Sequence, residues 1–434
     1  MFKFRWETEF KETEIGEIPK DWEIKKLKDV LRSLESGNRP KGGVLAHTPN
    51  GILSIGGENI NWDGSLELAE CLRFDENFYK DLKKGRIEQG DILLVKDGAT
   101  IGKLVYIKEV PEGKAMVNEH VFLLKPNTLK TSSRFLYYFL FSEIGQQQIE
   151  SSISGSAQGG INKSIQDNIL VFYPPLPEQS HIATVLSWFG DLIENKKRQN
   201  EILEKSAMAI FKNWFIDFEP FKNGEFVYNE ELGKEIPKGW EVKKLGEVVK
   251  TQYGITISGE NFGEIKLLRI TDINKTFVID WDNVPYCNLH EKMFYKYNLS
   301  DKDIVISRIA DIGKVAIIED PPKSVFASYL IRLKIKSDSN IKPYYLYYWL
   351  KSEIYQEYIL GAGEGSTREN TNAEVIKDGP ILIPDISILQ KFEELACDLR
   401  SKIILNQKQI MTLRKIRDTL LPLLVFGKLR VKEI

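Results

Sequence analysis

The chain has 434 residues, more than one hydrophobic core usually organises, so two or more domains are expected. Its composition, 42% hydrophobic and 28% charged, is typical of a globular protein. The net charge is only -2, because 60 lysines and arginines are balanced by 62 acidic residues. This balance argues against a protein held on nucleic acid by phosphate contacts alone, although it permits local basic patches.

Neither the cysteines nor the histidines form a disulfide or metal-binding pattern. The three cysteines are far apart, and the four histidines are scattered without an H-E-x-x-H motif. No apolar window approaches the roughly 18 residues of a membrane span. The start, MFKFRWETEFKETE, lacks the apolar middle of a signal peptide. We therefore expect a soluble, cytoplasmic protein without a bound metal.

The sequence repeats itself once. The opening IPKDWEIKKL, from Ile18, returns as IPKGWEVKKL from Ile236, and the string FLYYFLFSEIGQQQIE, from Phe135, returns as YLYYWLKSEIYQEYIL from Tyr345. Between them, IGGENI (55–60) aligns with LRITDI (268–273), and DILL (91–94) with DIVI (303–306). The spacing between matched segments changes along the repeat, so the framework is kept while loops differ. Two sites of one kind that read different things are expected, with neutral loop drift after duplication as the alternative.

Each copy predicts the same order of elements. Short β-rich runs such as DILLV and DIVIS come first, followed by an aromatic helix, a Gly/Ser loop (154–164 or 361–372) and a last strand. Trp22 and Trp240, and the YY-containing helices, are expected in the cores rather than on a nucleic acid. The pattern is that of an α+β globule followed by a helical arm.

The two arms carry apolar residues at helical spacing. The first runs from about Pro177 to Phe215, and the second from about Ile388 to Leu424. In the first arm, the apolar stripe consists of Ile182, Val185, Leu186, Phe189, Leu192, Ile193, Leu203 and Ile210. At about 50 Å each, the arms most simply pack together as an antiparallel coiled coil, although each could pack on its own globule. Asn406 falls at a core position and could set the register, or it could face solvent.

The predicted fold class is therefore α+β: two similar α/β globules separated by two long helices packed as an antiparallel coiled coil. The expected segments are a globule at 1–177, a helical spacer at 178–219, a second globule at 220–385 and a second spacer at 386–434.

Motifs for catalysis do not stand out. The string Tyr173-Pro174-Pro175-Leu176 lacks the Asn or Asp and the aromatic residue of a DNA methyltransferase turn, and no G-x-x-x-x-G-K-[ST] or G-x-S-x-G motif occurs. No catalytic residue is assigned, and we expect no cofactor.

Candidate DNA contacts are basic and polar residues on loops at matched places in the two copies. Arg suits guanine, Asn suits adenine, and Lys suits phosphate. For each residue taken alone, a solvated loop position is the alternative. The candidates are Arg39, Lys41, Lys96, Lys103, Asn162 and Lys163 in the first copy, and Arg269, Arg308, Lys314, Thr367, Arg368 and Asn370 in the second.

These features together resemble the specificity subunit of type I restriction-modification systems. The resemblance is carried by EIPKDWEIKKL and EIPKGWEVKKL, by PPLPEQSHI entering the first arm, by AIFKNWFIDFEPF leaving it, and by LLPLLVFGKLRV at the end of the second. One departure is LIPDISILQKFEEL, which lacks the Pro-Pro and Glu-Gln pairs and puts an identical second helix start in doubt.

The resemblance implies a non-catalytic subunit with two target-recognition domains, each reading one half of a split double-stranded DNA sequence. The helices would set the gap and bind two methyltransferase subunits, which restriction subunits then join. S-adenosylmethionine, ATP and Mg would be needed only by those partners. A coiled-coil interaction scaffold without a DNA role is the alternative.

Overall fold

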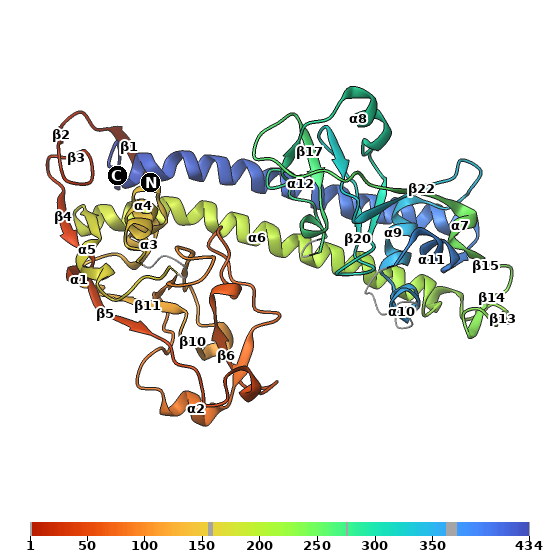
Figure 1. Ribbon diagram of the computed structural model, residues 1–434, viewed down its shortest axis with the longest axis horizontal. Helices are drawn as coiled ribbons and strands as arrows, with labels where there is room; N and C mark the ends of the chain where they lie inside the picture. Colours follow the sequence, from red (N-terminus) through yellow and green to blue (C-terminus); the bar gives the residue numbers. More distant parts are fainter. Residues whose placement is uncertain (1, 155–158, 275–276, 362–370, 434) are drawn as a thin grey trace. The chain divides into compact units, whose positions relative to one another are not determined.

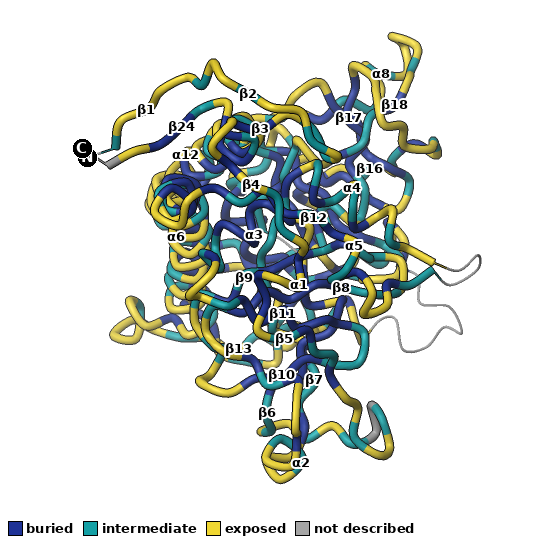
Figure 2. Tube along the Cα trace, turned by 90° about the vertical axis from the view of Figure 1, so that its left-hand side faces the viewer, coloured by how far each residue is buried: buried dark blue, intermediate teal, exposed yellow. Residues whose placement is uncertain are grey.

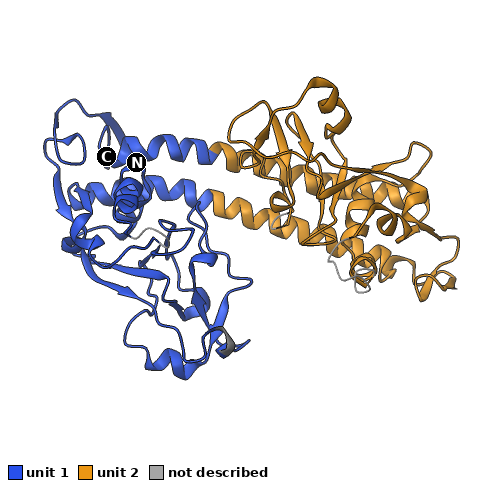
Figure 3. Ribbon diagram, in the orientation of Figure 1, with its two compact units in different colours: residues 1–192, 413–434 blue, residues 193–412 orange. Residues whose placement is uncertain are grey.

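The computed structural model describes residues 2–154, 159–274, 277–361 and 371–433. The chain divides into two compact units, residues 1–192 with 413–434 and residues 193–412 (Figure 3). Thr367, Arg368 and Asn370, three of the predicted DNA contacts, lie outside the described residues.

Two long helices each contribute to both units. They are α6 (Leu176–Phe215) and α12 (Ile386–Val425), each 40 residues long (Figure 1). Among the helices of the described residues, none is both long and apolar enough to cross a membrane.

The first unit contains short strands and helices between the chain start and α6, together with one strand after α12. Its strands are β1 (Phe2–Trp6), β2 (Phe10–Lys11), β3 (Ile18–Pro19), β4 (Glu23–Lys26), β5 (Leu31–Ser36), β6 (Ile52–Ile55), β7 (Leu72–Phe74), β8 (Ile92–Val95), β9 (Leu104–Tyr106), β10 (Ala115–Val117), β11 (Val121–Pro126), β12 (Leu170–Tyr173) and β24 (Leu429–Glu433). Its helices are α1 (Leu27–Val30), α2 (Glu76–Asp81), α3 (Ser133–Phe141), α4 (Glu143–Ser151) and α5 (Ile165–Asn168), with 3-10 turns η1 (Gly43–Ala46), η2 (Gly57–Asn59) and η3 (Pro111–Gly113).

From β3 onward, the second unit repeats this order of strands and α-helices, while η1 and η3 have no counterpart among its described residues. Its strands are β13 (Phe226–Asn229), β14 (Lys234–Pro237), β15 (Glu241–Lys244), β16 (Val249–Tyr253), β17 (Ile265–Leu268), β18 (Tyr286–Cys287), β19 (Ile304–Ser307), β20 (Val315–Ile317), β21 (Ser324–Phe326), β22 (Leu330–Ile335) and β23 (Pro380–Ile383). Its helices are α7 (Leu245–Val248), α8 (Glu291–Tyr297), α9 (Pro343–Lys351), α10 (Glu353–Gly361) and α11 (Ala373–Asp378), with η4 (Glu219–Phe221) and η5 (Ile270–Asp272).

The sheets of the two units share one topology. A four-stranded antiparallel sheet has the order β5-β11-β8-β9 in the first unit and β16-β22-β19-β20 in the second. A three-stranded sheet, β10-β6-β7 or β21-β17-β18, contains the parallel pairs β10–β6 and β17–β21. The sequence repeat is therefore a structural repeat, and the predicted α+β class is confirmed.

Apolar side chains fill the core of each unit as expected. Strands β8 and β11 are buried along their whole length (Figure 2). Trp22 is fully buried and Trp240 nearly so, and the aromatic helices α3 and α9 bury all their central side chains. These residues are core residues, which confirms the prediction made for the two tryptophans and the YY-containing helices.

Within each unit, α6 and α12 contribute side chains to the same hydrophobic core. In the second unit, the rings of Phe211 and Phe392 lie 5.5 Å apart, and Glu204 bonds to Arg400. Residues later in α6 contact residues earlier in α12, so the helices are antiparallel, as predicted. Of the predicted stripe in α6, Leu192 is the exception, since it is exposed.

Asn406 is fully buried, so it does not face solvent, which was one of the two alternatives for this residue. Its amide nitrogen donates to Asn200 Oδ1 at 2.9 Å and to Gln199 Oε1 at 3.3 Å, and Lys196 donates to its oxygen at 3.4 Å. A polar layer therefore crosses the apolar seam between the helices.

The end of the chain departs from the helical spacer expected at 386–434. Helix α12 ends at Val425, and Gly427 adopts a positive φ of 68° that a helix does not allow. The next residues form β24, which pairs antiparallel with β1. Arg430 on β24 then donates to Glu178, Asp21 and Glu7 inside the first unit.

The two long helices begin differently, as the missing Glu-Gln pair suggested. In the first unit, Gln179 on α6 accepts hydrogen bonds from Thr131 and from the Ser132 N–H before α3. The equivalent position on α12 is Leu389, and Glu393, one turn later, accepts the Tyr344 N–H at 3.0 Å at the start of α9. A carboxylate one turn along the helix thus replaces the amide.

Candidate nucleic-acid interface

One edge of each four-stranded sheet collects several loops, and we call it the loop edge. In the first unit, β5 and β8 end there while β9 and β11 begin there, because Ser36 pairs with Phe122 and Val95 with Val121. The second unit has the same arrangement, since Tyr253 pairs with Ile331 and Ser307 with Leu330. Loops distant in sequence therefore emerge side by side.

The loop edge of the first unit brings together most of the basic residues predicted in that copy. Arg39 follows β5, while Lys96 and Lys103 bound the turn between β8 and β9. The Ile161 N–H donates to the Lys96 carbonyl at 2.7 Å, which places the Asn162–Lys163 segment beside the same turn. Lys163 is exposed, as is Lys41 further along the Arg39 loop.

Acidic and aromatic side chains hold these basic groups in place. Arg39 pairs with Glu119 at 2.6 Å, and Lys96 pairs with Asp97 at 3.4 Å while its ammonium lies over the Phe122 ring. His120 Nδ1 lies 2.7 Å from Asp97 Oδ1, and its Nε2 lies 3.4 Å from the Arg39 guanidinium. The edge is therefore a connected polar surface rather than a set of isolated loop charges.

A pocket of about 260 Å³ opens beside this cluster. Its lining residues are Asn38, Arg39, Ser54, Glu58, Leu72, Phe74, Asn118, Glu119 and His120.

In the second unit, Arg308 and Lys314 occupy the places of Lys96 and Lys103. The Ser307 N–H donates to the Lys314 carbonyl at 2.9 Å, as the Val95 N–H does to that of Lys103. The Arg308 guanidinium lies over the Tyr253 ring and donates to the Ser328 carbonyl at 3.0 Å. This loop edge is thus aromatic and basic, where the first is richer in hydrogen-bonding groups.

Two predicted contacts have local roles that the sequence did not indicate. Arg269 makes a two-point ion pair with Asp272, three residues later, through Nε at 3.1 Å and Nη2 at 2.9 Å. Asn162 accepts the Ser164 N–H at 2.8 Å and so supports the turn before α5. Their roles on DNA remain predictions.

The structural repeat identifies further residues that the sequence reasoning missed. Asn372 caps α11 by accepting from Glu374 and Val375, and its place corresponds to that of Asn162. His120 and Tyr329, which directly precede β11 and β22, are also absent from the predicted contacts. Extending the DILL–DIVI alignment along the chain to β11 and β22 aligns EHVF with SYLI and so identifies that pair.

Close packing fixes the backbone of both loop edges. A Cβ at Gly37 would lie 1.8 Å from the Val117 carbonyl oxygen, and one at Gly254 would lie 2.2 Å from that of Ala327. Any residue with a side chain would clash at either place unless the neighbouring backbone moved.

A glutamine holds the basic turn in each unit. Gln146 on α4 donates to the Gly102 carbonyl at 3.2 Å and the Leu140 carbonyl at 3.0 Å. Gln356 on α10 donates to the Gly313 carbonyl at 2.9 Å and the Leu350 carbonyl at 2.7 Å. The framework of each loop edge is thus conserved between the units while its outward side chains differ.

The chain thus has two domains with matched frameworks and different loops, joined through long paired helices. The family model "Type I restriction modification DNA specificity domain" matches residues 19–205 and 237–411. The chain therefore belongs to this family and is a type I restriction-modification specificity subunit with two recognition domains.

Relatives and a solved structure agree with that assignment. The chain is 39% identical, over 448 residues, to the type I restriction enzyme MjaIX specificity subunit of Methanocaldococcus jannaschii, covering 100% of this chain and 99% of the relative. It is 28% identical over 460 residues to the putative MjaX specificity subunit of the same organism, with the same coverage. A crystal structure of the S subunit of a type I restriction-modification system from M. genitalium covers 93% of this chain and 96% of its own, with a TM-score of 0.53 and 18% identity, and shows the same fold.

Proposed function

We propose that each recognition domain reads one half of a bipartite double-stranded DNA sequence through its loop edge. The observation that carries this proposal is the pair of edges itself: the same strands, glycines and glutamines support different outward side chains. A scaffold that bound only proteins would not require a duplicated framework with different exposed loops. Lys and Arg on the edges supply phosphate and base contacts.

In this proposal α6 and α12 set the length of the unread gap and bind two methyltransferase subunits, which restriction subunits then join. Both helices carry exposed apolar side chains, among them Trp188 and Ile202 on α6 and Leu405 and Ile416 on α12. Exposed apolar groups of this kind are typical of surfaces that partners cover. The near-neutral net charge agrees with a DNA contact that is shared with those partners.

Adenine methylation and DNA cleavage take place in the partner subunits, and this chain contributes no catalytic residue. S-adenosylmethionine, ATP and Mg are accordingly needed by the partners, and this chain binds no cofactor of its own.

The test is to co-express the chain with a candidate methyltransferase subunit and to map adenine methylation across the host DNA. We expect a split motif that disappears when this chain is omitted. Methylation at an unsplit motif, or at the same sites without this chain, would contradict the proposal.

A further inference from the structure

His120 and Tyr329 occupy the same point of the two domains. Each directly precedes the strand at the centre of its loop edge, β11 or β22. The His120 carbonyl accepts the Lys96 N–H at 3.0 Å, and the Tyr329 carbonyl accepts the Arg308 N–H at 3.1 Å. The two positions are thus fixed by the same backbone hydrogen bond beside the same basic residue.

Their side chains face outward and differ in chemistry. The His120 side chain is 44% exposed, and Tyr329 is 49% exposed. The residues that fix the backbone around them are the same in both units: Gly37 matches Gly254, and Gln146 matches Gln356. At such a position the backbone is the same in both domains while the exposed side chain differs, so the position can give the two domains different base preferences.

Neighbouring side chains orient the histidine for hydrogen bonding. Its Nδ1 lies 2.7 Å from Asp97 Oδ1, while its Nε2 lies 3.3 Å from Glu119 Oε1 and 3.4 Å from Arg39 Nη2. The imidazole therefore belongs to a hydrogen-bonded group of side chains that lines the pocket. The aligned residue of the second unit places a phenol next to Arg308, whose guanidinium lies over the Tyr253 ring.

We propose that His120 and Tyr329 are specificity-determining residues, each contacting bases in its own half of the target, an inference that rests on the proposed function. Lys96 and Arg308, on the adjoining turns, contact the phosphates that set the register. The imidazole keeps its short Nδ1 contact with Asp97 and reads through Nε2, whose longer contacts with Glu119 and Arg39 a base replaces. The phenol reads by ring contact together with its hydroxyl. One structural position thus accounts for a difference between the two half-sites.

The experiment uses the full chain with its methyltransferase partner and compares His120→Ala with Tyr329→Ala by genome-wide methylation mapping. Each variant should lower the preference for the native base at one position at least tenfold, in only one half of the motif. The two variants must affect different halves. Leu129→Ala is the matched control, because Leu129 is 89% exposed but lies beyond the opposite end of β11.

The reciprocal variants His120→Tyr and Tyr329→His keep a ring at each position. If an alanine variant loses all methylation, these variants test whether the two residues set the base preference. A swapped variant that methylates the native motif would overturn the inference. So would a uniform loss of methylation at all sites with the base preferences unchanged, since that is the behaviour of a phosphate contact. A wild-type chain that directs no split motif would instead remove the proposed function itself.

Discussion

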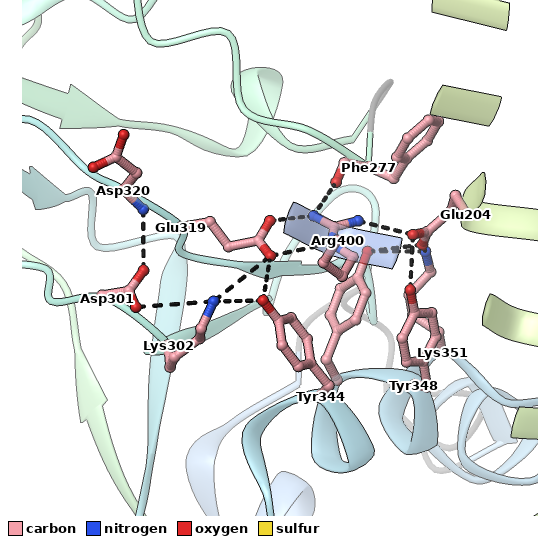
Figure 4. A network of polar contacts seen from close by, with 11 residues as sticks. Glu204, Phe277, Asp301, Lys302, Glu319, Asp320, Tyr344, Tyr348, Lys351 and Arg400 are labelled. Carbon is pink, nitrogen blue, oxygen red and sulfur yellow. Dashed lines mark hydrogen bonds and ion pairs between the residues drawn. The ribbon is translucent and has the colours of Figure 1, made fainter. Parts of the chain in front are cut away.

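The guanidinium of Arg400 on α12 donates a hydrogen bond of 2.8 Å to the carboxylate of Glu204 on α6, inside the second unit (Figure 4). The Arg400 side chain is fully buried, and that of Glu204 is 8% exposed. Burial acts to raise the pKa of Glu204, but Lys351 and Arg400 bring it below its ordinary value. The carboxylate is therefore ionised, and the contact between the two helices is a buried ion pair.

Replacing Arg400 by Met should destabilise the second unit by about 3–5 kcal/mol, because Glu204 and Glu319 would both lose their buried cation. Guanidinium chloride unfolding followed by tryptophan fluorescence measures this change. The control is Lys408→Met on the same helix, whose ion pair with Asp320 is 60% exposed on both sides. It should cost no more than about 0.5 kcal/mol, and equal losses in the two variants would contradict the assignment.

The polar layer between the helices should behave as a coupled pair. Asn406→Ala leaves the buried Asn200 side chain without its 2.9 Å partner and should cost about 1–3 kcal/mol. Replacing both residues by Leu removes the orphaned group and should recover most of that loss. Urea unfolding of Asn200→Leu, Asn406→Leu and the double Leu variant measures the coupling, and simple addition of the two single losses would show that the layer is not one unit.

Glu393 gives the second unit a pH dependence. Burial raises its pKa to about 7 from an ordinary 4.5, although the N–H groups of Tyr345 and Tyr344 act to lower it. Because the folded state then holds the proton more tightly than the unfolded state, the stabilisation is complete below pH 4.5 and is lost as the pH rises through 7.

Glu393→Gln should therefore flatten the decline in unfolding free energy between those two pH values. Unfolding curves at a series of pH values measure the slope. Glu394→Gln, one residue along the same helix and exposed, is the control and should retain the wild-type slope. A Glu393→Gln slope equal to that of the control would count against this source of the dependence.

Gln146 should matter for one half-site only. Gln146→Ala removes the donor to the Gly102 and Leu140 carbonyls, which should cost about 1–3 kcal/mol and loosen the turn carrying Lys96. We expect the base preference within the first domain's half-site to fall at least tenfold, while Gln356→Ala lowers the preference within the other half-site. Gln147→Ala, whose hydrogen bond to Glu143 is exposed, is the matched control. Loss of both halves in Gln146→Ala would contradict independent domains.

If α6 and α12 set the gap, lengthening both should lengthen it. Four residues inserted before Asn200 in α6 and after Asn406 in α12 add about 6 Å of helix. At about 3.4 Å of duplex per base pair, the unread gap should grow by one or two base pairs while both half-sites stay the same. Methylation mapping reads out the motif directly, and an unchanged gap would rule out the helices as its determinant.

The sequence by itself determined the duplication, the α+β class and the two long helices. These depend on local and periodic signals: IPKDW against IPKGW, the buried DILLV and DIVIS strands, and apolar residues at helical spacing. The burial of Trp22 and Trp240 followed from the same pattern, because large apolar groups at framework positions belong to cores.

Only the tertiary structure decided which loops meet. Arg39, Lys96 and Asn162 are far apart in sequence, and the register of β11 between β5 and β8 brings their loops to one edge. That register depends on hydrogen bonds between distant strands, which no local pattern specifies. The surroundings of His120 and Arg400 also depend on distant segments. His120 contacts Asp97 from another loop, and Arg400 is stabilised by carboxylates from two other segments.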